Sequence, residues 1–372
     1  MKSRLSLVNC ASYEPHLVQD ALTRSIELLG GVTNFIRPKS RVLVKPNLLL
    51  AKEPEYGITT HPEVVRAVAR ILKDIGCIVV VGDGPSVWDN QIGNVDEVYR
   101  RTGMTRVCEE EGVRLVHFDK KRMREKYPLA SWLDHCDYLV NIPKLKTHEL
   151  TVLTGAVKNL FGLVWGTFKV ELHKNYFHIE DFAKILVDVY EETRPALTVV
   201  DGILAMEGDG PATSGTLCHP KIVVAGNDCV SIDSVLSMIM GINPLDVPST
   251  KEAVSRGLGT AEIKEIEILG EQLKELNIKP FRMPVTSKHR KLPQPVINLA
   301  KKLIRYYPCV ERDQCVKCAA CIKMCPKKVI TMKPKGIVFD YPKCIACFCC
   351  QEICPNAAIK VKKSIFAKIV GL

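Results

Sequence analysis

Eight cysteines near the C-terminus form two copies of one spacing pattern. Each copy reads C-x2-C-x2-C-x3-C-P, and matching positions lie 29 residues apart. The first three thiolates of a copy suit three corners of a [4Fe–4S] cubane. Zinc also binds C-x2-C pairs, but a zinc site needs four ligands and no third cysteine at this spacing. The pattern therefore predicts two [4Fe–4S] clusters rather than zinc.

The cysteine-rich tail resembles bacterial-type two-cluster ferredoxins. A short β-like run follows each copy, at residues 329–332 and 358–361. In such ferredoxins the cysteine before proline ligates the other cluster. The resemblance implies one cluster on Cys315, Cys318, Cys321 and Cys354, and the other on Cys344, Cys347, Cys350 and Cys325. Cys349 is then a spare thiol or an exchangeable ligand.

The 372-residue chain divides into three predicted parts. They are an α/β body at 1–279, a Pro-rich basic linker with an amphipathic helix at 280–307, and the two-cluster domain at 308–372. Ten of the sixteen cysteines lie in the last seventy residues and the rest are scattered, which does not suggest a disulfide scaffold. We expect a reducing cytoplasm in an anaerobic organism. No signal peptide or run of about 20 apolar residues is apparent.

Positive charge is concentrated in the tail. Residues 280–372 hold 19 Lys and Arg against 4 Asp and Glu, a formal +15, whereas residues 1–279 carry −4. A basic surface would attract an acidic electron donor such as a free ferredoxin, although lysines could equally offset cluster charge. Residues 296–307 and 362–372 have basic amphipathic patterns, so peripheral membrane contact is an alternative to packing on the domain itself.

The body alternates apolar β-rich runs with helical patterns. This alternation predicts an α/β fold, a mostly parallel sheet with helices on both faces, beside the small α+β ferredoxin-like domain. The expected strands are residues 4–9, 41–45, 77–81, 113–118, 137–142, 196–200 and 221–225. The expected helices are residues 18–29, 62–75, 179–193 and 230–240.

Polar residues gather just after five of these strands. The carboxyl ends of parallel strands share one edge of a sheet, where ligands bind, so we expect these side chains to surround one crevice. Lysines there would hold an anionic substrate or an additional anionic cofactor, and acids or a histidine would move protons. For each residue taken singly, an ordinary turn or a solvated surface lysine is the alternative interpretation. The candidate catalytic residues are Lys144, Lys146, His148, Lys158, Asp83, Asp201, Glu207 and Asp209, and the candidate cofactor-binding residues are Lys45, Asn47, Gly84 and Asn159.

These body motifs resemble the family catalogued as domain of unknown function 362. The resemblance covers roughly residues 5–245, and members often carry a two-cluster ferredoxin tail. The motifs are Lys45-Pro46-Asn47, Thr60-His61-Pro62, Gly82 to Pro85, Pro143 to His148, Gly155 to Gly162, Asp201-Gly202 and Glu207 to Pro211.

Three hypotheses of function follow. In the first, the chain is an oxidoreductase that passes electrons through both clusters to the anionic ligand in the body. In the second, it is a non-catalytic electron-transfer or maturation module for a partner enzyme. In the third, it is a membrane-associated electron carrier. No phosphate-binding loop or dinucleotide-binding glycine motif is present, and we expect no nucleic-acid partner.

Overall fold

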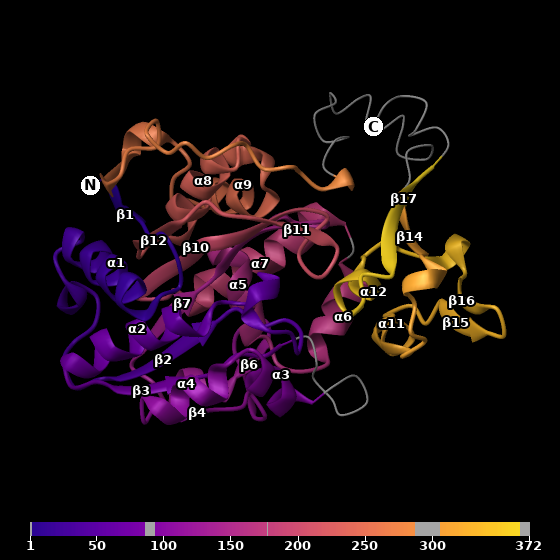
Figure 1. Ribbon diagram of the computed structural model, residues 1–372, viewed down its shortest axis with the longest axis horizontal. Coiled ribbons are helices and arrows are strands. Elements are labelled where there is room, and N and C mark those ends of the chain that lie inside the picture. The colour runs from indigo at the N-terminus through magenta and orange to yellow at the C-terminus, as the bar shows by residue number, and fades with distance from the viewer. Residues whose placement is uncertain (1, 86–93, 177, 287–305, 365–372) are drawn as a thin grey trace.

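The structure is a computed structural model that describes residues 2–85, 94–176, 178–286 and 306–364. An α/β body and a small cysteine-rich tail lie side by side (Figure 1). The body sheet has the strand order β13-β1-β12-β10-β7-β2-β3-β4, with β8, β9 and β11 attached beside β10. Its strands are β1 (Ser3–Asn9), β2 (Arg41–Pro46), β3 (Ile78–Val81), β4 (Arg114–Leu115), β7 (Tyr138–Ile142), β8 (Lys144–His148), β9 (Val152–Thr154), β10 (Leu197–Gly208), β11 (Gly215–Cys218), β12 (Ile222–Gly226) and β13 (Ile266–Gly270).

Most neighbouring strands along this order are parallel. β12 is the exception, because it pairs antiparallel with both β10 and β1. β10 and β12 are joined by a short segment that contains β11. Because parallel neighbours need a long crossover connection, strands joined by so short a segment pair antiparallel. The polar residues 226–228, which follow the predicted strand 221–225, were expected at the same edge as the other polar turns. They lie at the opposite edge, because β12 runs antiparallel to its neighbours.

Helices cover both faces of the sheet, as predicted. Alternate residues of one strand point into two apolar cores: Val42 and Val44 into one, and Leu43 into the other. This explains why the strands read as continuous apolar runs. One core is covered by α1 (Pro15–Leu28), α2 (Pro62–Asp74), α3 (Val95–Arg101) and α4 (Met104–Glu110). The other is covered by α5 (Ala156–Asn159), α7 (Ile179–Thr193), α8 (Cys229–Ile239) and α9 (Pro248–Ser255).

The segment after β7 is a strand rather than the loop expected from its sequence. Pro143 interrupts β7, but β8 continues in the same direction along the twelve-residue β10. Side chains alternate along a strand, so Lys144, Lys146 and His148 share one face of β8. All three are buried. β8 and the part of β10 that pairs with it extend beyond the main sheet, and β8 places Lys144, Lys146 and His148 in a row on this extension.

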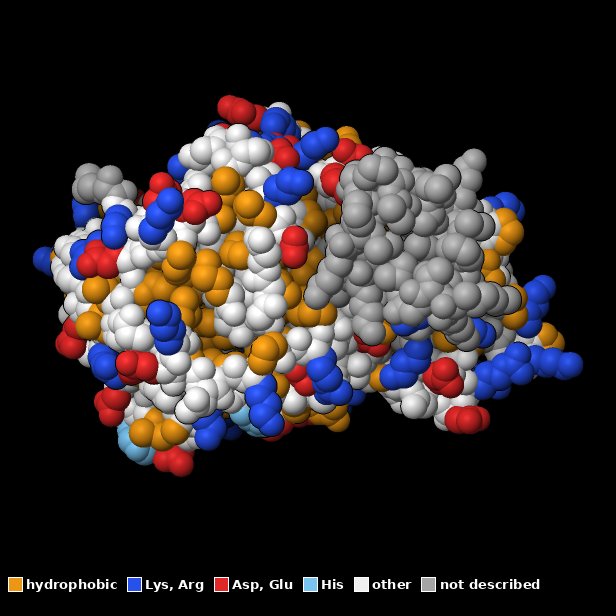
Figure 2. Space-filling view, turned by 90° about the horizontal axis from the view of Figure 1, so that it is seen from above, with side chains coloured by type: hydrophobic (Ala, Val, Ile, Leu, Met, Phe, Trp, Pro, Cys, Tyr) orange, Lys and Arg blue, Asp and Glu red, His pale blue; other side chains and the backbone are white. Residues whose placement is uncertain are grey.

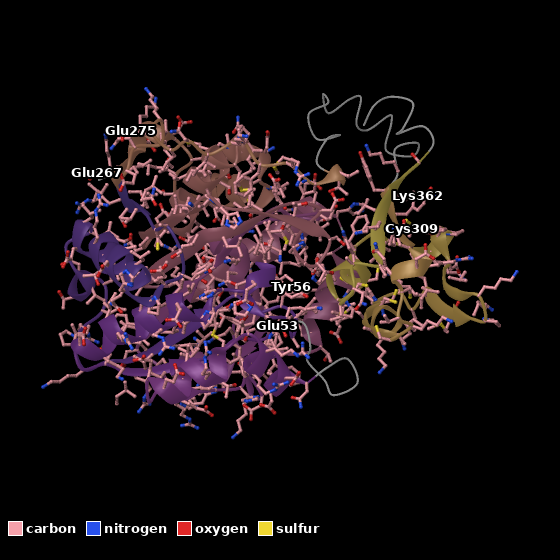
Figure 3. All side chains as sticks on the ribbon, viewed as in Figure 1. Glu53, Tyr56, Glu267, Glu275, Cys309 and Lys362 are labelled. Carbon is pink, nitrogen blue, oxygen red and sulfur yellow. The ribbon has the colours of Figure 1, made fainter. Side chains whose placement is uncertain are left out.

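The tail contains two antiparallel strand pairs and two short helices. Its elements are β14 (Tyr306–Val310), α11 (Ala320–Met324), β15 (Ile330–Lys333), β16 (Gly336–Phe339), α12 (Cys349–Glu352) and β17 (Ile359–Lys363). The outer strands β14 and β17, which carry Cys309 and Lys362, pair with each other (Figure 3). The apolar core of the tail is continuous with the core beneath α1 and α2.

The predicted amphipathic segments fall largely outside the described residues. Within the first of them, Tyr306 and Tyr307 belong to β14 and are not helical, because they pair with β17. Within the second, Lys362 and Lys363 also belong to a strand. Across the part of the chain that the structure describes, no helix has the length and apolar character needed to span a membrane.

Candidate functional site

The eight motif cysteines surround two cavities in the tail. The first thiol cavity is lined by Cys315, Cys318, Cys321 and Cys354. The second thiol cavity is lined by Cys325, Cys344, Cys347 and Cys350. In each cavity the fourth thiol comes from the other sequence copy, which is the grouping that the ferredoxin resemblance implies.

The backbone around the two cavities repeats with the cysteine spacing. Left-handed residues occur in pairs 29 positions apart: Lys317 with Ala346, Ala319 with Phe348, and Lys328 with Ala357. Backbone N–H groups also donate to matching sulfur atoms, from Val329 to Cys325 Sγ at 3.4 Å and from Ala358 to Cys354 Sγ at 3.3 Å. Four thiols around an apolar cavity, with N–H groups directed at sulfur, fit a [4Fe–4S] cluster.

The tail docks on the carboxyl-end side of the body sheet. Thr213 donates from Oγ1 to the carbonyl oxygen of Cys354 at 2.8 Å and accepts the N–H of Ala357 at 3.1 Å. His148 Nε2, at the end of β8, lies 3.2 Å from Glu352 Oε1 in α12. These contacts fix α12 against the basic extension of the sheet.

A third cavity, of about 80 Å³, lies between body and tail, and we call it the interdomain cavity. Since roughly 10–15 Å³ by this measure holds one water molecule, it has room for several waters or one small ion. The body contributes residues from β2, the turn after β3, α5 and α6 (Phe168–Asn175), and the tail contributes residues from α11 and α12. The polar and charged lining residues are Lys45, Asn47, Asp83, Thr154, Lys158, Asn159, Lys169, His173, Cys349 and Glu352.

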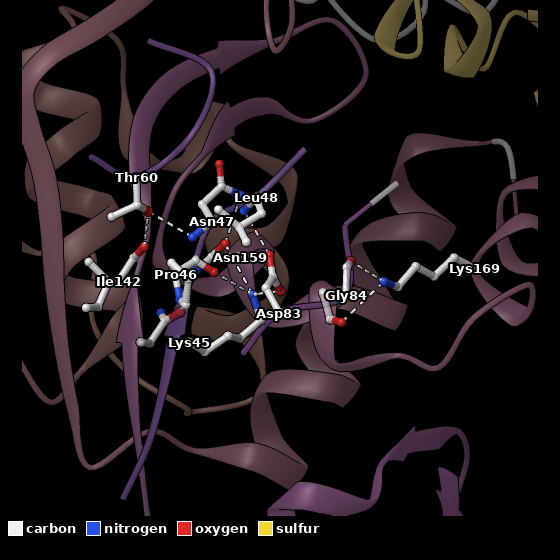
Figure 4. Close-up of polar contacts among 12 residues, drawn as sticks. Lys45, Pro46, Asn47, Leu48, Thr60, Asp83, Gly84, Ile142, Asn159 and Lys169 are labelled. Carbon is white, nitrogen blue, oxygen red and sulfur yellow. Dashed lines mark hydrogen bonds and ion pairs between the residues drawn. The ribbon is translucent and has the colours of Figure 1, made fainter. Parts of the chain in front are cut away.

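A buried ion pair forms the floor of the interdomain cavity. Lys45 Nζ lies 2.7 Å from Asp83 Oδ1, and both side chains are almost completely buried. Asp83 Oδ2 also accepts the N–H of Leu48, and Asn159 Oδ1 accepts from the amide of Asn47 at 2.9 Å (Figure 4). Gly162 packs so closely that an added Cβ would come within 2.6 Å of Lys45 Nζ. A glycine is therefore required beside this pair.

Two further lysines place positive charge at the cavity. Lys169 Nζ donates to the carbonyl oxygens of Gly84 at 2.6 Å and Gly162 at 3.2 Å (Figure 4). Burial lowers the pKa of Lys169 to about 7, although Asp83 opposes the change. Lys158 is partly buried, and its ammonium group forms no hydrogen bond or ion pair with any of the described residues. An ammonium group in this position favours an anion in the cavity.

The tail contributes one carboxylate to the same cavity. Burial alone would raise the pKa of Glu352, but His148, Lys158 and His173 together lower it to about 2. Burial lowers the pKa of His148 to about 4. His148 Nδ1 accepts two backbone N–H groups, so its neutral ring carries the proton on Nε2, the nitrogen that lies 3.2 Å from Glu352 Oε1. When every lysine and acid of the lining is ionised, the cavity has one excess positive charge.

Several predicted site residues do not reach this cavity. Lys144 Nζ pairs with Asp201 Oδ2 at 2.8 Å and with the Tyr13 hydroxyl at 2.7 Å, and the Lys144 and Asp201 side chains are fully buried. Lys146 Nζ donates to the carbonyl oxygen of Ile58 at 2.6 Å, and burial lowers its pKa well below the ordinary value. The expectation that all the candidates share one crevice is thus corrected, because the extended β8 is packed inside the fold.

The acidic loop lies apart as well. Glu207 forms an ion pair with Arg282 at 2.6 Å, and Asp209 accepts the N–H of Val285 at 3.1 Å. Both carboxylates therefore anchor the segment that follows the body. They do not line the interdomain cavity.

Sequence reasoning did not single out Thr154, Lys169 or Glu352 of the lining, and it treated Cys349 only as a spare thiol or an exchangeable ligand. Lys169 and His173 lie on the short helix α6, which has no clear periodic signal. The sequence could have drawn attention to Glu352, because it is the sole acidic residue after Asp340 in a strongly basic tail. Cys349 faces the interdomain cavity and does not line either thiol cavity.

Comparison with known proteins identifies both parts of the chain. The family model described as Domain of unknown function (DUF362) matches residues 42–237, and that of the 4Fe-4S dicluster domain matches residues 314–362. The chain is also 31% identical over 270 residues to the thylakoid-associated protein sll1697 of Synechocystis sp., covering 69% of this chain and 81% of that protein.

Proposed function

The chain belongs to the DUF362 family and carries a 4Fe-4S dicluster domain, which makes it an iron–sulfur electron-transfer protein, and we propose that it delivers electrons to a small anion bound in the interdomain cavity. The observation that carries this proposal is the composition of that cavity. Body lysines and the tail helix α12, which holds the cluster-ligand candidate Cys350, line one space.

The proposed ligands are the cysteines that line each thiol cavity. A cluster bound by four thiolates takes up and releases one electron, so two reduced clusters hold the two electrons of an ordinary two-electron reduction. Cys349 precedes Cys350 and lines the interdomain cavity. A ligand there would lie close to the second thiol cavity, as electron transfer requires.

Charge and size define the class of ligand. Lys45 is neutralised by Asp83, which leaves Lys158 and Lys169 to attract the ligand and Glu352 to oppose a large negative charge. A cavity of about 80 Å³ suits a small monoanion such as a carboxylate. Lys169, whose pKa is about 7, would hold the anion and supply a proton to it.

The proposal is tested by anion binding to the anaerobically purified protein. Calorimetry with acetate as the probe should show binding that weakens about tenfold or more in Lys158→Gln, because an ammonium facing a partly dry cavity contributes roughly 1.5–3 kcal/mol to such a contact. Lys174→Gln is the matched control, since Lys174 is exposed on α6. Equal affinity in both variants would remove the anion site, as would no detectable binding by the unaltered protein.

The small cavity also favours a second function, in which the body binds no substrate and the chain passes electrons to a partner enzyme. In that case acetate would not bind. The related sll1697 is described as thylakoid-associated, which supports peripheral membrane contact as an additional proposal for this chain. Flotation with anionic vesicles at low salt tests it, and the proposal fails if the protein stays with the soluble fraction.

A further inference from the structure

The two sequence copies of the tail have the same local backbone but different surroundings. The loop of the first copy, residues 316–320, contains Val316 at 59% exposure and an exposed Cys318. In the second copy the residue matching Cys318 is Cys347, which is 8% exposed. Phe348 and Cys349, which follow it, are also buried. Because the two copies have the same local backbone, they can be compared directly. The difference in burial between Cys318 and Cys347 therefore reflects where each copy lies in the molecule.

The buried loop is the one directed at the body. Cys349 lines the interdomain cavity with Lys158 and Glu352, whereas Ala320, its counterpart 29 residues earlier, lines only the first thiol cavity. The second thiol cavity is therefore the inward one. The first is the one whose loop presents a cysteine to solvent.

The exposed loop has the features of a docking surface. Among the tail residues that the structure describes, Val316 has the most exposed large apolar side chain, and Lys317 is next to it in sequence. Protein interfaces commonly combine an apolar centre with a charged rim. Val316 and Cys318 both line the wall of the first thiol cavity, so a partner resting on this loop would approach that cavity closely.

The charge of the surrounding surface identifies the partner. Residues 314–362 contain nine lysines and two acids. Of the two acids, Glu352 faces the body and Asp340 is paired with Lys343 at 3.0 Å. Two further acidic residues, Glu311 and Asp313, lie just before this segment. Figure 2 shows Lys and Arg side chains projecting at the tail end of the molecule. Lys333, the last residue of β15, and Lys335, in the turn before β16, are both exposed.

We propose that the Val316–Cys318 loop is the docking site of an acidic protein electron carrier, and that the first thiol cavity is the outer electron port while the second serves the body. The carrier loses one electron, which is taken up at the outer cluster, and no bond is formed or broken. This inference rests on the proposed cysteine ligands but not on an anion in the interdomain cavity. It gives the duplicated halves of the tail separate roles.

Stopped-flow reduction by a reduced [2Fe–2S] ferredoxin of net negative charge tests the proposal. At low salt, Lys317→Glu should slow the second-order rate about tenfold, and the effect should shrink as salt screens the attraction. Val316→Asp should slow the reaction at low and high salt. Lys251→Glu, which makes the same charge change at an exposed residue of α9 in the body, should leave the rate within about twofold.

Two controls keep the result interpretable. Reduction by dithionite should reach the same amplitude in every variant, which shows that the clusters are intact; Lys317→Gln replaces Lys317→Glu if the latter loses iron. Hydrogen exchange with the carrier bound should show protection at residues 315–320 and not at 344–349. Equal slowing by Lys251→Glu, unchanged rates in both loop variants, or protection at 344–349 alone would overturn the proposal, whatever the result for acetate.

Discussion

Anion binding in the interdomain cavity should depend on pH through Lys169. Its ammonium group donates to two carbonyl oxygens, and burial lowers its pKa to about 7. A bound anion stabilises the charged form, so binding requires this proton. With a pKa of 7, the protonated fraction falls from about ten elevenths at pH 6 to about one eleventh at pH 8. Acetate affinity should therefore fall about tenfold over this range.

The assay is calorimetry of acetate binding at pH 6, 7 and 8, in buffers of different ionisation enthalpy. At pH 8 the unaltered protein should take up nearly one proton per acetate. In Lys169→Met the affinity should be lower at pH 6 and almost independent of pH, whereas Lys174→Met, an exposed position on the same helix, should retain the full dependence.

The two neighbouring histidines do not duplicate this behaviour. Burial lowers the pKa values of His148 and His173 to about 4, below the range of the assay. Lys45 and Lys158 also have lowered pKa values, so the comparison with Lys169→Met isolates the proton in question. An acetate affinity that is flat from pH 6 to 8 in the unaltered protein would refute the reasoning, as would loss of the pH dependence in Lys174→Met.

Three further outcomes follow from the structure. Lys144→Met should lower the free energy of unfolding by about 3–5 kcal/mol in urea, because it leaves the buried Asp201 carboxylate unpaired; a loss under 1 kcal/mol would contradict the buried pair. Gly162→Ala should destabilise the protein by roughly 1–3 kcal/mol and weaken acetate binding, and wild-type values for both would show that the floor of the cavity is not tightly packed. Glu207→Ala should leave acetate affinity unchanged and cost at most about 1 kcal/mol, since its partner Arg282 is exposed; a weakened acetate affinity would place the acidic loop in the site after all.

The fold was predictable where the sequence pattern of a segment matched the way that the segment is buried in the structure. Helix 179–193 is found as expected, and the strands at 41–45 and 137–142 differ from β2 and β7 by one residue at an end. A strand that is buried on both faces is continuously apolar in sequence, and this pattern is a strong signal for a strand. β8 was missed because its lysines and histidine suggested a loop. Their polar groups are accommodated in the interior beside Asp201, the carbonyl oxygen of Ile58 and Glu352, and all of these neighbours are distant in sequence.

The site was predictable only in part, for a related reason. The residues that follow β2 and β3 meet at one edge because the strands are parallel neighbours, so Lys45 and Asp83 could be expected to lie together. The pairing of Lys144 with Asp201 instead of a ligand depends on side-chain packing across β8 and β10. The contribution of the tail to the cavity depends on how two domains dock, and no local pattern encodes that contact.

If electrons reach an anion in the interdomain cavity, the clusters and that cavity must act on each other. An anaerobic redox titration followed by electron paramagnetic resonance, with and without saturating acetate, tests it most directly. We expect two [4Fe–4S] signals and about eight iron atoms per chain, with acetate lowering the midpoint potential of one cluster and leaving the other nearly unchanged. This shift should be lost in Lys158→Gln. Identical potentials and spectra with and without acetate, in protein shown to bind it, would contradict the proposal.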